Sequence, residues 1–170
     1  RKNVELLTKE EIPVFLDNGA VQTFRLGTKE LSMDYLRSVC KDIKPNFLLA
    51  PDVIGDPKGT LDRQLKFIEQ NDDLELLAPL QSHNYGPIFE DRIVNDIDIL
   101  KDAGYQRFGF GKPHVGTRPM MTRKETLMQF GVRLRPHCDY LHFLGYPLGS
   151  SVGGSNYLDS ADVPTFFLLK

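Results

Sequence analysis

Short apolar runs that recur about every 30 residues, the length of one βα unit, constrain this chain more than any other feature. They alternate with segments whose apolar residues recur at helical spacing. The runs cover residues 13–16, 47–51, 75–80, 107–111 and 140–144, and we expect a sixth at 165–169. This alternation predicts a parallel sheet of βα units.

The segments between the runs carry helix signals. Residues 28–43 form one apolar stripe. Asp56 and Pro57 predict a cap and a first turn for a second helix, and Gly104 predicts the end of a third that opens at Pro87. A capping box, Thr122 with Glu125, predicts the start of a fourth helix.

Polar groups stand where the apolar runs end. Groups just past the carboxyl ends of parallel strands line the active sites of such folds. The sequence therefore predicts one mouth surrounded by Asp17, Asp52, Gln81, Lys112 and Asp159.

Two architectures are compatible with this pattern. An open doubly wound sheet is complete with five or six strands, so the length of 170 residues favours it slightly. A (β/α)8 barrel needs eight strands, and this chain would be a partial barrel of about six βα units. However, no glycine-rich phosphate loop follows the first run, and polar groups at five successive strand ends suit a barrel mouth. We expect one domain over residues 1–170, cut from a longer protein because it ends inside an apolar run.

Composition excludes several classes. The net charge of −2 does not indicate an overall basic surface for binding nucleic acid, so any such surface must be a local patch. No apolar run has the roughly 20 residues that cross a membrane. Cys40 and Cys138 fit a reducing cytoplasm and cannot form a multi-cysteine zinc site. The histidines lack metal-ligand spacing, and we expect His142 to be a hydrogen-bonded interior residue. We expect no metal and no cofactor.

Each candidate residue has a plain structural alternative. Asp17 can form an Asx turn, Asp52 can be a turn residue, and Gln81 can be a surface amide instead of a ligand for a nucleobase edge. Because Asp56 already serves as the helix cap, Asp52 is available for another role.

Gly109 and Gly111 alternate within one run, which suggests that another group lies against the backbone there. Packing inside a barrel is the alternative for one of these two glycines. Asp159 could act as a nucleophile or as an acid/base, whereas capping of a helix is the structural interpretation.

In this order, the motifs resemble the tRNA-guanine transglycosylase superfamily, most closely its DNA-modifying branch. Residues 17–22, Asp-Asn-Gly-Ala-Val-Gln, are similar to the family's Asp-Ser-Gly-Gly-Phe-Gln. Asp52 falls on the Asp of its Phe-Asp-Glu segment, and Gln81 on the Gln of its Gln-Gly-Gly segment. Residues 108–112 resemble Gly-Leu-Ala-Val-Gly-Glu, residues 141–145 look like the strand before the catalytic loop, and Asp159 falls on the segment of the nucleophilic Asp.

The resemblance implies a (β/α)8 barrel and a base exchange in which guanine in nucleic acid is replaced by a 7-deazaguanine base. It implies that Asp159 attacks the sugar C1′ and that Asp17 moves protons to the leaving base and from the incoming one. Asp52 and Gln81 would read the purine edge, assisted by the backbone near Gly109 and Gly111.

Two departures bear on the substrate. Lys112 and Val53 stand where the family has Glu, which favours a neutral, nitrile-bearing base, and DNA is expected over tRNA. A basic patch for the nucleic-acid backbone is expected from Lys112, Arg118, Arg123, Lys124, Arg133 and Arg135, the alternative being a solvated helix face. Exchange on tRNA, a barrel hydrolase or lyase acting on a sugar phosphate, and a non-catalytic nucleic-acid-binding barrel remain as alternatives.

Overall fold

The structure is a computed structural model that describes part of the chain. The described residues are 14–19, 26–27, 29, 31–81, 88–111, 114–115, 118–119, 127–145 and 157–161, with the backbone alone for 88–90, 114–115, 118–119 and 127–128. The predicted strand at 165–169 and the capping box of Thr122 and Glu125 lie outside these residues.

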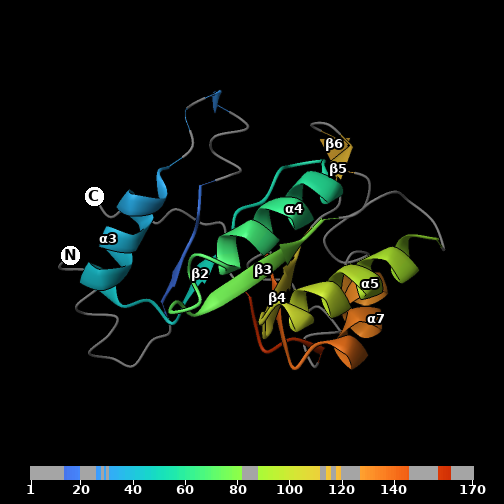
Figure 1. Cartoon of the computed structure of the whole chain (residues 1–170). Coiled ribbons are helices and arrows are strands. Elements are labelled where there is room, and N and C mark those ends of the chain that lie inside the picture. The colour runs from blue at the N-terminus through green and yellow to red at the C-terminus, as the bar shows by residue number, and fades with distance from the viewer. Residues whose placement is uncertain are drawn as a thin grey trace, which may run out of the picture.

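Six parallel strands form one sheet in the order β1-β2-β3-β4-β7-β8 (Figure 1). The strands are β1 (Phe15–Leu16), β2 (Phe47–Leu49), β3 (Leu76–Leu80), β4 (Arg107–Phe110), β7 (Tyr140–Phe143) and β8 (Ser160–Ala161). The five strands expected from the apolar runs are confirmed. A separate antiparallel pair, β5 (His114–Val115) and β6 (Arg118–Pro119), was not expected.

The described helices pack on one face of this sheet. Buried residues on that face include Leu48, Ala78 and Phe108. They form one cluster with Ile97 of α5 (Ile88–Asp102) and Leu134 of α7 (Val132–Leu134). The residues that alternate with them, such as Phe47, Leu49 and Leu77, form a second cluster with no helix residue in it. Among the described strands, the order in the sheet follows chain order without reversal, so this part of the sheet has no switch point and is not doubly wound.

The sheet curls around the face that carries the second cluster, on which no described helix packs. Three strands separate β1 from β7, which would place them roughly 19 Å apart in a flat sheet. Yet the rings of Phe15 in β1 and His142 in β7 lie 5.3 Å apart between centroids. The fold is therefore a curled, six-stranded parallel half-barrel, compatible with a partial (β/α)8 barrel.

The interior of this curl contains a small polar group. His142 is 1% exposed, and its Nδ1 lies 2.7 Å from the hydroxyl of Ser160. The same hydroxyl lies 2.7 Å from the hydroxyl of Tyr140. The expectation that His142 is a hydrogen-bonded interior residue is confirmed.

Two helices match their sequence signals closely. Helix α4 (Pro57–Ile68) begins with Asp56, whose carboxylate accepts a hydrogen bond of 2.9 Å from the backbone of Gly59. Helix α5 (Ile88–Asp102) is followed by Gly104, whose φ of 111° is the left-handed region expected at a helix end. Both helices flank β3 on the same side of the sheet (Figure 1).

The other two helices differ from expectation. Helix α3 (Met33–Ile43) is capped by Ser32 and therefore starts later than residue 28. The fourth helical segment contains a π-helical turn (Leu127–Gly131), followed by the short α7 (Val132–Leu134) and a 3-10 turn (Arg135–His137). Among the described residues, no helix has the length and apolar character needed to cross a membrane.

Candidate active site

Three of the predicted polar residues follow neighbouring parallel strands. Asp17 comes directly after β1, Asp52 comes shortly after β2, and Gln81 comes directly after β3. Because these strands are parallel, their carboxyl ends meet at the same edge of the sheet. The prediction that Asp17, Asp52 and Gln81 share this edge is confirmed by their interactions.

The carboxylate of Asp52 is held by a side-chain amide at each oxygen. Gln81 Nε2 donates to Oδ2 at 2.7 Å, and Asn18 Nδ2 donates to Oδ1 at 3.3 Å. Asn18 Nδ2 also donates to the backbone carbonyl of Ala50 at 2.6 Å. Three strand ends are thereby joined around one half-buried carboxylate.

Burial raises the pKa of Asp52 to about 6. The hydrogen bonds from Asn18 and Gln81 act in the opposite direction, and the negative charge of Asp17 raises the pKa further. A carboxyl group with a pKa close to neutrality can gain or lose a proton under ordinary conditions. Asp52 can therefore serve either as an acceptor for a ligand edge or as a proton carrier.

The turn after β2 leaves Asp52 available for this site. Asp56, and not Asp52, caps α4. The backbone N–H of Val53 donates to Thr60 Oγ1 at 2.8 Å, and the same hydroxyl donates to the carbonyl of Val53 at 3.2 Å. This pair of bonds fixes the backbone directly after Asp52.

Asp17 forms the Asx turn that was the structural alternative and also lies at the candidate site. Its Oδ1 accepts a hydrogen bond of 2.9 Å from the backbone of Gly19, which is an Asx turn, and Gly19 has a φ of 78°. The side chain is nevertheless exposed at the edge, and its charge acts on Asp52. The turn orients Asp17 without removing it from the site.

Packing bears on both Gly109, in β4, and Gly111, which directly follows this strand. A Cβ atom at Gly109 would lie 2.6 Å from Leu77 Cδ2. A Cβ atom at Gly111 would lie 3.3 Å from both the Cβ and the carbonyl oxygen of Leu144. Interior packing, the alternative interpretation, therefore accounts for Gly109, in line with the expectation that it accounts for one of the two glycines; at Gly111 the contact with Leu144 is tight but leaves room for adjustment.

We expect Gly109→Ala to lower the free energy of unfolding by about 1–3 kcal/mol, because the added methyl group overpacks a buried site. Chemical denaturation measures this effect. In a Leu77→Ala background, where the clashing atom is absent, the same substitution should cost little. An equal cost in both backgrounds would contradict the packing explanation.

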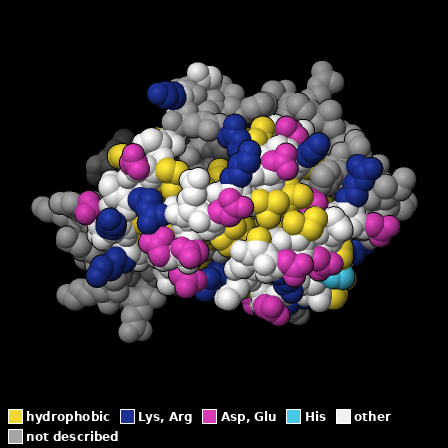
Figure 2. Space-filling model, viewed as in Figure 1, with side chains coloured by type: hydrophobic (Ala, Val, Ile, Leu, Met, Phe, Trp, Pro, Cys, Tyr) yellow, Lys and Arg dark blue, Asp and Glu magenta, His cyan; other side chains and the backbone are white. Residues whose placement is uncertain are grey.

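The expected basic patch is only partly described. Lys112, Arg123 and Lys124 lie outside the described residues, as does the side chain of Arg118. Arg133 lines a groove between α5 and α7 that also contains Asp91 and Asp98. On the face shown in Figure 2, the described basic side chains are interspersed with acidic ones around a central hydrophobic area.

Asp159 does not lie where the sequence placed it. It precedes β8 instead of following a strand, and its backbone N–H donates to the carbonyl of Leu141 at 3.0 Å. Its carboxylate accepts a bond of 2.7 Å from the N–H of Leu141 and forms an ion pair with Arg135. Arg135 belongs to the turn before β7, so this ion pair lies beside the amino-terminal half of that strand.

The side chain of Asp159 also points away from the concave face. Ser160, the next residue, contacts His142 on the concave side, and successive side chains of a strand alternate between faces. Burial raises the pKa of Cys138, a residue of the helix-side core, to about 12. The negative charge of Asp159 also acts to raise this pKa. In this structure Asp159 is a partner of Arg135 and not a neighbour of Asp52.

The misplacement has a simple origin. The sequence pattern places the last strand at 165–169 and therefore leaves Asp159 outside any strand pairing. The structure begins β8 at Ser160, so Asp159 directly precedes a strand. The next carboxylate in the sequence is Asp162, which lies outside the described residues.

Sequence reasoning missed Asn18 as a site residue. The amide stands between Asp17 and Gly19 directly after a strand, and this position was the available signal. An amide there can reach the end of the neighbouring strand, and Asn18 does so at Ala50 and Asp52.

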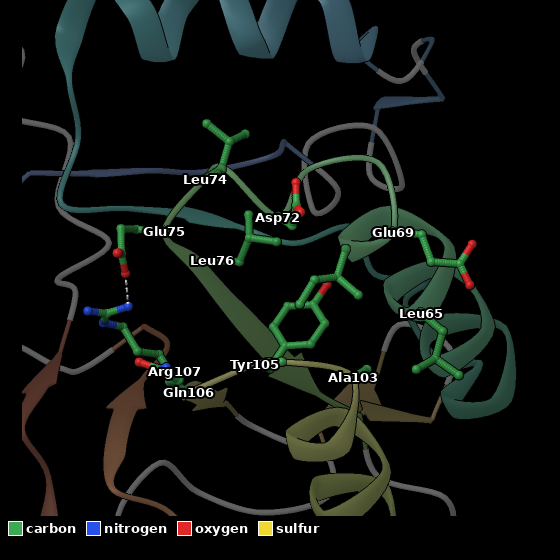
Figure 3. Close-up of a pocket in the computed structure, with 12 residues that line it drawn as sticks. Leu65, Glu69, Asp72, Leu74, Glu75, Leu76, Ala103, Tyr105, Gln106 and Arg107 are labelled. Carbon is green, nitrogen blue, oxygen red and sulfur yellow. Dashed lines mark hydrogen bonds and ion pairs between the residues drawn. The ribbon is translucent and has the colours of Figure 1, made fainter.

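A groove of about 500 Å³ lies at the other end of the sheet. It is lined by residues from the end of α4, the end of α5 and the starts of β3 and β4, among them Leu65, Leu74 and Tyr105 (Figure 3). Glu75 and Arg107 form an ion pair at its border. Because groups at the amino-terminal ends of barrel strands serve stability, we do not assign the active site to this groove.

Within the described part of the chain, no three His, Cys, Asp or Glu side chains are placed to bind a metal ion together. No protein-family model matches this chain, and no curated protein matches it in sequence.

Proposed function

We propose that this chain carries the base-binding part of a glycosyltransferase that exchanges guanine in nucleic acid for a 7-deazaguanine base. The single observation that supports it is the half-buried carboxylate of Asp52, held at both oxygens by amides at the shared edge of three strands. Asp17, a second carboxylate, lies at the same edge.

The chemistry of a purine fits this arrangement. Guanine presents two adjacent N–H donors, at N1 and N2, and an ionised carboxylate accepts from both. The side chain of Gln81 adds an amide that can donate or accept. A base within a nucleic acid must leave its stack to reach such a group, as in other enzymes that act on bases.

The exchange requires a nucleophile and a proton carrier. A carboxylate oxygen bonds to the sugar C1′ while the bond from C1′ to N9 breaks, and the electron pair leaves with guanine. Asp17 donates a proton to the departing base and accepts one from the incoming base, whose N9 then displaces the carboxylate. We assign the attack to Asp162 in place of Asp159, because Asp159 is paired with Arg135 and Asp162 is the next carboxylate in the sequence.

The substrate assignments depend on the sequence motifs. Val53 and Lys112 replace acidic residues of the similar family, which supports a neutral, nitrile-bearing base over an aminomethyl-bearing one. DNA is proposed over tRNA because the motifs are closest to the DNA-modifying branch.

Incubation of the protein with radiolabelled guanine and either duplex DNA or tRNA tests the proposal. We expect label to enter DNA, and unlabelled nitrile-bearing 7-deazaguanine to release it again. Incorporation into tRNA alone would replace DNA as the substrate. No incorporation into either polymer, with guanine bound, would reduce the proposal to a base-binding module, and no guanine binding would refute it.

A further inference from the structure

Asn18 reaches two groups on the neighbouring strand with one nitrogen. Its Nδ2 lies 2.6 Å from the carbonyl oxygen of Ala50 and 3.3 Å from Oδ1 of Asp52. An amide nitrogen has two hydrogens, so one can be directed at each acceptor. The contact with the backbone of Ala50 determines where the other hydrogen points.

The second oxygen of Asp52 is held from the opposite side. Gln81 Nε2 donates to Oδ2 at 2.7 Å. A carboxylate on a short side chain otherwise rotates broadly about its last torsion angle. Two amides, one from the end of β1 and one from the end of β3, remove that freedom.

We propose that Asn18 is a positioning residue of this site: with Gln81, it sets the plane of the Asp52 carboxylate so that the remaining lone pairs accept a planar ligand edge with two adjacent N–H groups. The ligand class rests on the proposed function, whereas the positioning role does not. Among the described residues, Asp17 supplies the charge that acts on Asp52.

The chain contains a matched control for Asn18. Asn46 Oδ1 accepts a hydrogen bond of 2.7 Å from the backbone of Val14 and so also joins β1 to β2, beside their amino-terminal ends. This bond involves a backbone group and does not reach Asp52. Asn46→Ala therefore removes a similar strand contact and leaves the carboxylate untouched.

The test is a titration of the Asp52 carboxyl carbon by ¹³C NMR, without ligand, in the whole protein. Loss of a donor to the charged form should move the midpoint upward, by about one pH unit in Asn18→Ala. Asn18→Asp, which replaces the donor by a second acid, should move it further. Asn46→Ala should titrate like the wild type.

Guanine binding is measured separately on the same variants. We expect Asn18→Ala to weaken guanine about tenfold at pH 7 and Asn46→Ala to leave its affinity unchanged. If the titration shifts but guanine fails to bind even the wild type, the positioning role stands and the proposed function fails.

Two results would overturn the positioning role. One is an unchanged midpoint in Asn18→Ala. The other is an equal shift in Asn46→Ala, which would show that any contact between the two strands has this effect. If Asn18→Ala does not fold, Gln81→Ala serves as the test in its place. It removes the donor at the other oxygen of Asp52 without altering β1, and it should also raise the midpoint of the Asp52 titration.

Discussion

Replacing Asp52 with Asn is expected to make the protein more stable at pH 7 by about 2 kcal/mol and to abolish base exchange. Burial raises the pKa of this carboxyl from 3.8 to about 6, so at neutral pH the folded protein carries a charge that the unfolded chain solvates better. Asn has a similar shape without that charge. The amide of the Asn side chain would also place an N–H donor against the N1 and N2 donors of guanine. The kcat/KM of base exchange should therefore fall about 1000-fold or more.

The pH dependence follows from the direction of the shift. Between 3.8 and about 6 the folded protein binds the proton of Asp52 and the unfolded chain does not, so the stability of the wild type falls as the pH rises through this window. The gain in the free energy of unfolding of Asp52→Asn over the wild type should therefore reach its full value above this pH range and vanish near about pH 4.

Urea denaturation at several pH values measures this difference. Asp56→Ala is the matched control, since it removes the cap of α4 and should destabilise the protein by about 1 kcal/mol at neutral pH. A Asp52→Asn variant that is less stable than the wild type at pH 7 would contradict the raised pKa. Full exchange activity in that variant would remove Asp52 from the site.

The second large effect concerns the carboxylate that we propose attacks the sugar. We expect Asp162→Asn to abolish exchange and the covalent sugar adduct, and Asp159→Asn to retain both. Asp159→Ala should instead cost about 1–3 kcal/mol of stability, because it leaves the N–H of Leu141 without its acceptor and Arg135 without its ion pair. Trapping the adduct on a nucleic-acid substrate and mapping the modified peptide by mass spectrometry distinguishes the two acids.

Arg135→Ala is the control for this prediction. It breaks the same ion pair without touching either acid, so it should lower stability and leave the adduct in place. An adduct mapped to Asp159 would mean that this residue leaves Arg135 during the reaction. Exchange that survives in both Asp159→Asn and Asp162→Asn would exclude a covalent mechanism through either acid.

Local signals predicted the elements of this fold well. The apolar runs located five strands, Asp56 and Pro57 located the start of α4, and Gly104 located the end of α5. These features depend on hydrogen bonds, backbone angles and side-chain spacing within a few residues, so they can be seen in the sequence. The same reasoning placed Asp17, Asp52 and Gln81 at one edge.

Errors arose where a distant segment decides the outcome. Nothing near Gly109 reveals that Leu77 fills the space beside it. Nothing near Asp159 reveals that it aligns with Leu141, which places its carboxylate at Arg135. Asn18 became a site residue only because β1 pairs with β2 in a register that brings Ala50 and Asp52 within its reach.

The sequence of this protein was sufficient to define its βα repeat and the polar groups that end its strands, because both arise from periodic burial along the chain. Folding in three dimensions settled the remaining questions: that the helices lie on one face, that the sheet curls until Phe15 meets His142, and which carboxylates share an edge. Strand register and sheet curvature are properties of pairs of segments far apart in the chain, so no single segment encodes them.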